Sequence, residues 1–269
     1  MKISAIQMDL AFNDPVKNEE KIEQLVGDII RKESPDTIVL PEMWNLSFYP
    51  KDVKENADKE GIRSKALLSR LSKTHQVNIV GGTVATISNG QLFNSSYQYD
   101  RMGQLIHTYH KVHLFSPSEE DKVFTPGQEL GVFELDGIKV GIATCYDLRF
   151  VEWIRLLALE EIEILFVPAA WPHPRVSHWQ TLLKARAIEN QVFVVGVNSI
   201  GQANELKFCG HSVILDSLGE ALAESAEEET ILTAELDLSH RKEIKTQINV
   251  FKDRRSELYQ IKKKNNRFF

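Results

Sequence analysis

The sequence is poor in cysteine and has no long hydrophobic run. Cys145 and Cys209 are its two cysteines and stand far apart in 269 residues, so a disulfide framework is not expected. No stretch approaches the roughly 18 apolar residues that a membrane-spanning helix needs. Asp9 and Asp14 interrupt the first apolar residues too early for a signal peptide. We therefore expect a cytoplasmic protein that does not associate with membranes.

A surplus of basic residues and the usual metal-binding spacings are also lacking. The formal net charge is −6, which argues against a general nucleic-acid binder because no excess of Lys or Arg can face phosphates. The eight histidines are scattered, with no HExxH and no CxxC pair. Gly81-Gly82 lacks the spacing of a nucleotide-binding loop. We expect no metal, no cofactor and no nucleic-acid partner.

Strand-like and helix-like segments alternate along almost the whole chain. Apolar runs typical of strands occupy 3–9, 37–40, 77–84, 138–145, 162–171, 192–198, 211–216 and 231–237. Helical patterns begin at Pro15 and cover 64–75, 149–160 and 177–190, where Ser177 and Gln180 have capping-box spacing. The runs 92–100 and 104–112 resemble a hairpin. Without a linker or composition break, residues 1–269 are predicted to form one α/β domain of two stacked mixed sheets covered by helices.

Three reactive side chains follow predicted strands, where α/β proteins place their sites. Glu42 follows TIVLP, Lys111 follows LIHTYH, and Cys145 follows IKVGIAT. Taken singly, each has an ordinary explanation, such as a small buried thiol for Cys145. Together they meet the needs of a cysteine nucleophile, which requires a base and a group that stabilises an oxyanion. The residues alone leave open whether the three converge.

Five further segments stand out in order along the chain: LPEMW (40–44), KVHLF (111–115), TPGQ (125–128), GIATCYDLRF (141–150) and RAIENQ (186–191). Together they resemble the nitrilase superfamily of carbon–nitrogen hydrolases, and the match continues to FKDRRSELY (251–259). A papain-like cysteine protease has less support, because the glycine and tryptophan context of its cysteine is absent.

The resemblance implies a set of expectations about the fold and the site. It implies an αββα sandwich fold and a Glu–Lys–Cys triad on Glu42, Lys111 and Cys145. Homodimers are common among such proteins, so a homodimer is expected. The resemblance also implies a second glutamate, which falls on Glu120 or, with a shift of one residue, on Glu119. The implied reaction hydrolyses an amide through a cysteine thioester and uses no cofactor. The backbone N–H of Tyr146 is expected to help Lys111 hold the oxyanion.

CYDLRF and PAAWPHPRVSHW (168–179) look like the corresponding segments of the omega-amidases. That branch hydrolyses the terminal amide of short 2-oxo-dicarboxylic acid monoamides such as 2-oxoglutaramate. An arginine binds both oxygens of a carboxylate at once, so Arg175 and Arg149 are candidates for the substrate clamp, although either could form a structural ion pair. Trp171 could line the pocket or fill the core. A deaminated-glutathione amidase, an N-carbamoyl hydrolase and a catalytically silent scaffold stay open as alternatives.

Overall fold

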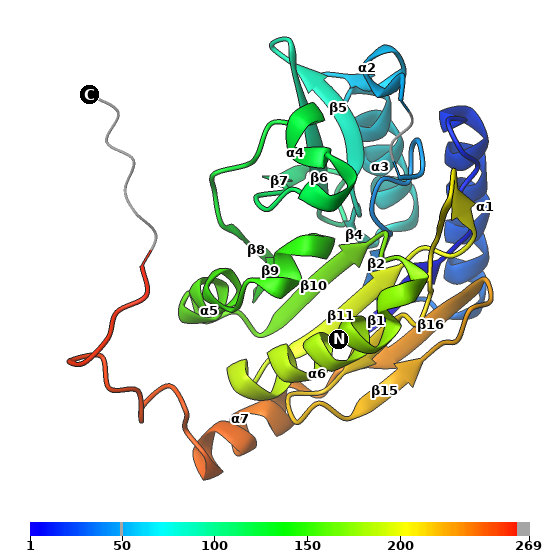
Figure 1. The fold of residues 1–269 in the computed structure, drawn as a ribbon. Helices are drawn as coiled ribbons and strands as arrows, with labels where there is room; N and C mark the ends of the chain where they lie inside the picture. The colour runs from blue at the N-terminus through cyan, green and yellow to red at the C-terminus, as the bar shows by residue number, and fades with distance from the viewer. Residues whose placement is uncertain (49–50, 263–269) are drawn as a thin grey trace.

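The computed structural model describes residues 1–48 and 51–262, and two mixed sheets form its centre (Figure 1). The first sheet has, in spatial order, β16 (Thr230–Glu235), β1 (Lys2–Gln7), β2 (Thr37–Val39), β4 (Asn78–Val80), β6 (Gln91–Tyr99), β5 (Val84–Ser88) and β3 (Asp58–Lys59), with β7 (Leu105–His110) on β6. The second has β15 (Ala221–Glu224), β14 (Val213–Leu215), β11 (Phe193–Asn198), β10 (Ile164–Ala169), β9 (Ile138–Ile142) and β8 (Gly131–Leu135).

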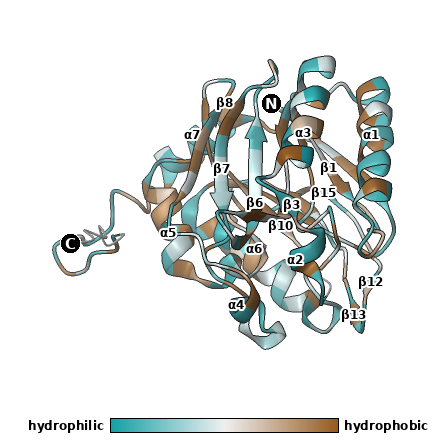
Figure 2. Ribbon diagram, turned by 90° about the horizontal axis from the view of Figure 1, so that it is seen from above, coloured by the Kyte–Doolittle hydropathy of each residue, from teal (hydrophilic) through white to brown (hydrophobic). Residues whose placement is uncertain are grey.

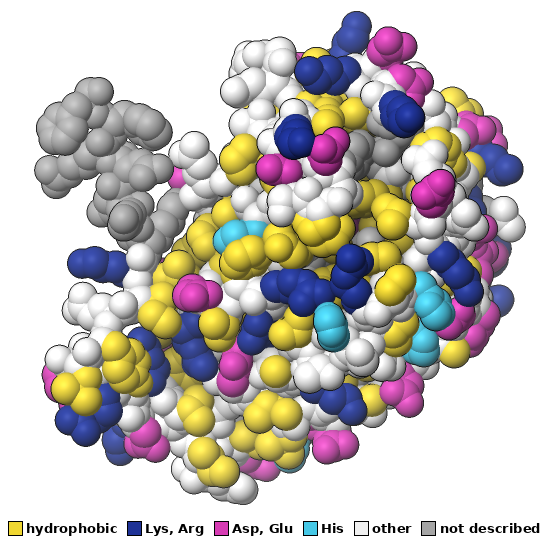
Figure 3. All heavy atoms as spheres, viewed as in Figure 1, with side chains coloured by type: hydrophobic (Ala, Val, Ile, Leu, Met, Phe, Trp, Pro, Cys, Tyr) yellow, Lys and Arg dark blue, Asp and Glu magenta, His cyan; other side chains and the backbone are white. Residues whose placement is uncertain are grey.

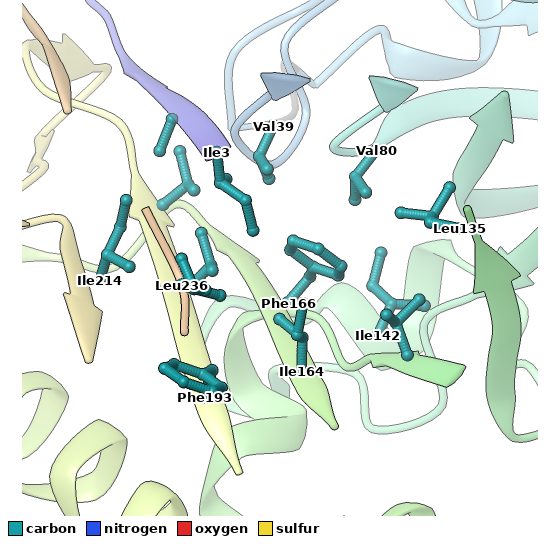
Figure 4. Close-up of a cluster of buried hydrophobic side chains, with 14 of the residues drawn as sticks. Ile3, Val39, Val80, Leu135, Ile142, Ile164, Phe166, Phe193, Ile214 and Leu236 are labelled. Atoms are coloured by element: carbon teal, nitrogen blue, oxygen red, sulfur yellow. The ribbon is translucent and has the colours of Figure 1, made fainter. Parts of the chain in front are cut away.

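Hydrophobic side chains of the two sheets meet face to face and form the central core. Figure 4 shows Ile3, Val39 and Val80 of the first sheet opposite Ile142 and Phe166 of the second. All five are buried. Each strand can contribute side chains to this core and to an outer face, because successive residues point to opposite sides of a sheet.

Helices cover both outer faces, which makes the fold a four-layer αββα sandwich. Helices α1 (Pro15–Lys32) and α3 (Ile62–His75) pack on the first sheet, and α5 (Val151–Leu159) and α6 (Val176–Asn190) pack on the second. Figure 2 shows hydrophilic and hydrophobic residues alternating along α1, as a helix with one buried face requires. The two-sheet prediction is confirmed.

Helix starts show where local sequence rules hold and where they fail. Asp14 caps α1 by accepting a hydrogen bond from Lys17 N, with Pro15 in the first turn. The capping box predicted from Ser177 and Gln180 is wrong. Helix α6 starts at Val176, and its N-cap, Arg175, makes no capping hydrogen bond, because the preceding 3₁₀ turn η3 (His173–Arg175) already carries the backbone into the helix.

Short elements join the layers near the site described below. They are α2 (Val53–Asn56), α4 (Glu120–Val123), the 3₁₀ turns η1 (Ser116–Ser118) and η2 (Cys145–Arg149), and the hairpin β12 (Gln202–Ala203) with β13 (Leu206–Lys207). Helix α7 (Leu238–Gln247) follows β16, and the described residues after it extend away from the sheets (Figure 1). Within the described ranges, no helix is long and apolar enough to cross a membrane.

Candidate active site

Cys145 lies in a backbone turn between β9 and α5. Strand β9 ends at Ile142, and Cys145 begins η2 with a positive φ of 46°. A residue other than glycine rarely adopts this conformation, and such strain is concentrated at functional sites. Asp147 holds the turn, since its carboxylate accepts a hydrogen bond of 2.8 Å from Thr144 N.

Glu42 reaches the same place from the end of β2 and is completely buried. Its Oε2 accepts a 2.8 Å hydrogen bond from Ala170 N, just beyond β10, and its carboxylate lies near enough to the Cys145 thiol to raise the pKa of that thiol. The turn that carries Glu42 packs against Gly82, where an added Cβ would overlap the carbonyl oxygen of Pro41. Gly82 therefore allows the close packing of this turn.

Lys111 follows β7 and forms the centre of a buried charge cluster. Its Nζ lies 2.9 Å from Glu42 Oε1 and 2.8 Å from Glu120 Oε2, and all three side chains are buried. The lysine backbone extends the β6–β7 pairing, because Lys111 N donates to Asn94 O. The carbonyl of Lys111 accepts from Gly127 N, so the TPGQ segment supports the lysine directly.

Glu120 and not its neighbour is the second glutamate of the cluster. Glu120 is fully buried at the start of α4, and its Oε2 also accepts from Phe115 N at 2.7 Å. Glu119 is exposed and pairs with Lys122. Asn94 adds a partner that the sequence did not reveal. Its Nδ2 lies 2.9 Å from Glu42 Oε1 and 3.1 Å from Glu120 Oε1.

Burial and charge set the protonation of the cluster. Burial and the nearby Glu42 carboxylate hold the pKa of Cys145 well above its usual value, against the opposing effect of Lys111. Burial works against the charged form of Lys111, but Glu120 and Glu42 hold its pKa well above the usual range. Burial raises the pKa of Glu120, against the pull of Lys111. The resting site thus contains a neutral thiol beside a charged lysine.

A second layer of hydrogen bonds braces the Cys145 turn. Asp147, also buried, accepts from Tyr109 OH at 2.7 Å and from His113 N at 2.8 Å. Burial and the Asp147 charge raise the pKa of Tyr109 well above its usual value, which keeps its hydroxyl a donor. Arg186, in the RAIENQ segment, donates from Nε and Nη2 to Leu148 O at 3.1 and 2.9 Å. The resemblance marked KVHLF and RAIENQ, but sequence reasoning did not assign their His113 and Arg186 to this support.

A small pocket opens onto Cys145 and has cationic and aromatic walls. It encloses about 370 Å³, open mouth included, and is lined by Phe48, Phe115, Cys145, Tyr146, Arg149, Ala170, Trp171, Pro172, Arg175 and Leu206. In the space-filling view, basic and hydrophobic side chains lie next to one another across the middle of the face shown (Figure 3). The four residues predicted to bind substrate all belong to this lining.

Both candidate arginines lie over aromatic rings, and within the described part of the chain neither forms an ion pair. The Arg149 guanidinium lies 4.8 Å from the Trp171 ring centre, and Arg175 lies 5.5 Å from that of Phe115. Arg149 also contacts His178 Nδ1 at 3.2 Å. Trp171 is both pocket wall and core, since it lines the cavity and packs on Trp179. The cationic charge of the pocket is therefore available to an anionic ligand.

The arrangement matches the chemistry of amide hydrolysis by a cysteine. A thiol, a carboxylate that can take its proton and an ammonium that can stabilise an oxyanion share one buried site. Among residues 1–48 and 51–262, no group of three or more His, Cys, Asp or Glu side chains could hold a metal ion.

Comparisons with known proteins show which family the chain resembles. The carbon–nitrogen hydrolase family model matches residues 2–246. The chain is 42% identical to a 2-oxoglutaramate amidase of Bacillus subtilis, over 96% of this chain and 98% of that one. It is 31% identical to omega-amidase NIT2 of Xenopus tropicalis, over 94% and 95%. Its fold is similar to that of Saccharomyces cerevisiae Nit3, a nitrilase superfamily member, with a TM-score of 0.88, 25% identity and coverage of 95% and 96%.

Proposed function

The chain belongs to the carbon–nitrogen hydrolase family, and from this premise we propose that it hydrolyses the terminal amide of a small substrate that carries a carboxylate. It is an amide-hydrolysing enzyme. The proposed substrate type is a 2-oxo-dicarboxylic acid monoamide such as 2-oxoglutaramate. The observation that carries the proposal is the pocket itself, where Arg149 and Arg175 line the same small cavity as Cys145.

In the proposed first half-reaction, the sulfur of Cys145 attacks the amide carbonyl while Glu42 takes the thiol proton. The Glu42 carboxylate acts directly on the pKa of the thiol in the resting site, so it is placed to take the thiol proton. The carbonyl oxygen becomes negative and is held by Lys111 and the backbone N–H of Tyr146. One oxyanion donor contributes about 10²–10³ in rate. Two N–H groups of Lys111 can serve Glu42 and Glu120, which leaves the third for the oxyanion.

The C–N bond then breaks and the nitrogen leaves as ammonia with the proton that Glu42 returns, which completes the first half-reaction. A thioester then joins the acyl group to Cys145. Glu42 next takes a proton from water, the hydroxide attacks the thioester carbonyl, and the C–S bond breaks to release the carboxylic acid. The proton returns to the sulfur. Acid–base assistance of this kind contributes about 10²–10⁴ in rate. Glu120 orients Lys111 and Glu42 throughout the cycle.

Arg175 is the proposed clamp for the substrate carboxylate, with Arg149 as the next candidate. Strand β10 runs parallel to β9, so the loops after both strands lie at one edge of the sheet, as ligand sites of parallel sheets do. The loop after β10 carries Arg175 and the loop after β9 carries Cys145. Both therefore approach one pocket, where the clamp can hold one end of a short substrate while the thiol attacks the other.

A panel that measures released ammonia tests the proposed function. It contains 2-oxoglutaramate, a neutral amide of similar size, deaminated glutathione, an N-carbamoyl amino acid and a nitrile. The highest kcat/KM is expected for 2-oxoglutaramate. A higher value for another member would reassign the substrate branch, and no turnover of any member would favour a silent scaffold.

We also propose a cytoplasmic homodimer built from one domain over residues 1–269. The family match over 2–246 and two free, buried cysteines support the single domain and the reducing compartment. Val151 on α5 and Ile188 on α6 are exposed hydrophobic residues that a partner could cover. Light scattering of the purified protein is expected to give twice the 30.7 kDa chain mass, and a monomeric mass would contradict the dimer.

A further inference from the structure

Asn94 lies between the two buried glutamates, and no step of the proposed reaction uses it. It is the fourth residue of β6, and its side chain is buried. Its Nδ2 contacts Glu42 Oε1 at 2.9 Å and Glu120 Oε1 at 3.1 Å, and Lys111 Nζ contacts the same two oxygens at 2.9 and 3.1 Å. One amide and one ammonium thus hold the two carboxylates together.

The orientation of this amide follows from chemistry. Only Nδ2 can donate to a carboxylate, and a flipped side chain would place Oδ1 against two negative oxygens. The oxygen of the same amide, Asn94 Oδ1, is buried and has no hydrogen-bond partner among the described residues. A buried carbonyl without a partner destabilises a fold. The placement of this side chain is therefore explained by the two bonds that Nδ2 donates and not by a bond to Oδ1.

The backbone of the same residue supports the third charged group. Lys111 N donates to Asn94 O at 2.9 Å, so a displacement of Asn94 would also displace the lysine. The titratable groups that face the two glutamates are Lys111, at the end of β7, and Cys145, in η2. Lys111 is the cationic one of these two, and Asn94 is the neutral donor that both carboxylates share.

We propose that Asn94 is a positioning residue, which holds the carboxylates of Glu42 and Glu120 side by side so that Glu42 can accept the thiol proton. The inference rests on the proposed role of Glu42 as the base. Two neighbouring carboxylates repel each other, and each donor that they accept favours their charged forms. Loss of the shared donor should therefore make the pair harder to ionise.

Asn94→Leu tests the inference, and Asn78→Leu is its matched control. Asn78 is also a buried strand asparagine of the first sheet, donates to a carboxylate (Asp136 Oδ2, 2.8 Å) and has a buried Oδ1 without a described partner. In Asn94→Leu, the acid limb of the kcat/KM profile should move up by about one pH unit. KM should change little, because Asn94 is not part of the pocket lining. The control should keep the wild-type profile.

A second measurement does not depend on the substrate. The rate of Cys145 alkylation by iodoacetamide, followed by mass spectrometry across pH, reports how readily Glu42 accepts the thiol proton. Its acid-side inflection should shift upward in Asn94→Leu alone. A shift in this profile without hydrolysis of any amide would refute the proposed function and support the positioning role. Unshifted profiles in both measurements would overturn the inference.

Asn94→Thr keeps the test decisive if circular dichroism shows that the leucine variant does not fold. Threonine suits a strand, and its single hydroxyl hydrogen can serve one carboxylate at a time. A smaller upward shift of the same inflection is expected. A threonine variant with the wild-type inflection would overturn the inference.

Discussion

At the scale of single residues, the two cysteines occupy different surroundings. Cys145 contacts a carboxylate and lines the pocket. Cys209 is completely buried, accepts from Asn198 Nδ2 at 3.2 Å and has its pKa raised by burial to about 12. A fully buried thiol that does not line the pocket is a structural group.

Cys145→Ala is therefore expected to fold normally and to lose turnover by at least about 10³-fold, as expected when a nucleophile is removed. Cys209→Ala is the control and should keep most of the activity. Mass spectrometry of wild-type protein during turnover should find an acyl group on Cys145. Substantial activity in Cys145→Ala would show that the proposed triad is wrong.

Arg175 is the residue on which substrate choice is proposed to depend. A charge-assisted bond to a carboxylate contributes about 1.5–3 kcal/mol, which corresponds to roughly 10- to 150-fold in affinity. Arg175→Lys should weaken the binding of 2-oxoglutaramate by a factor in this range, because lysine lacks the planar fork of the guanidinium. The binding of a neutral amide should change much less.

The pattern of losses identifies the clamp. An equal loss for the acidic and the neutral substrate would make Arg175 a structural residue. No loss for either would move the clamp elsewhere, and Arg149→Lys would then be measured in the same assay. Both arginines are suitable for this comparison because, among the described residues, neither has an acidic partner to leave unpaired.

At the scale of elements, Asp147 joins β7, the segment after it and the Cys145 turn. The Asp147 carboxylate accepts hydrogen bonds from four donors, at Tyr109, Thr144 and the backbone and ring of His113. In Asp147→Asn, one of the two oxygens is replaced by an amide nitrogen that cannot accept these bonds. We expect a loss of about 2–4 kcal/mol in the free energy of unfolding, together with a fall in kcat as the turn loosens.

Asp136→Asn is the matched control, because its carboxylate is partly exposed and pairs with Arg101 at the surface. It should lower the free energy of unfolding by about 1 kcal/mol or less. Urea unfolding of both variants makes the comparison, and equal losses would contradict the bracing role of Asp147.

Most long elements were predicted to within a few residues, and the short ones were not. The hairpin predicted at 92–100 and 104–112 is β6 with β7. Strand β8 (Gly131–Leu135) and helix α7 were not predicted. Helix α4, which carries Glu120, has four residues and lies below the length at which periodicity gives a signal. The Ser177 capping box failed because a tertiary turn determined where α6 begins.

At the scale of the whole molecule, Arg101 connects the two sheets at one edge. It contacts Asp36, which precedes β2, at 2.7 Å, and Asp136, in the β8–β9 turn, at 2.6 Å. Burial works to raise the pKa of Asp36, but hydrogen bonds from Lys2 and Arg101 lower it below its ordinary 3.8. Arg101 likewise lowers the pKa of Asp136.

Both carboxyl groups therefore release protons more readily in the folded chain than in the unfolded one. Their contribution to stability is present above pH 3.8 and is lost as the pH falls through their lowered pKa values. Arg101→Gln should lower the free energy of unfolding at neutral pH by about 1 kcal/mol or less per pair. The difference from wild type should vanish in acid.

Urea titrations at several pH values measure this difference. Arg63→Gln, which removes a more exposed arginine from its ion pair with Glu19, controls for the lost charge. A constant difference between wild type and Arg101→Gln at every pH would contradict the assignment.

The sequence by itself determined the layered α/β class and the family resemblance, and it singled out Glu42, Lys111 and Cys145 as candidates for the active site. It could do so because strand periodicity and motif order are local properties of the chain. The tertiary structure decided which glutamate joins the cluster, that Asn94 bridges the two carboxylates, and that both arginines line one pocket with Cys145. The hydrogen bonds of this cluster join residues up to 69 positions apart, as Glu42 and Lys111 are. They are set by strand order and sheet stacking, which no local pattern specifies.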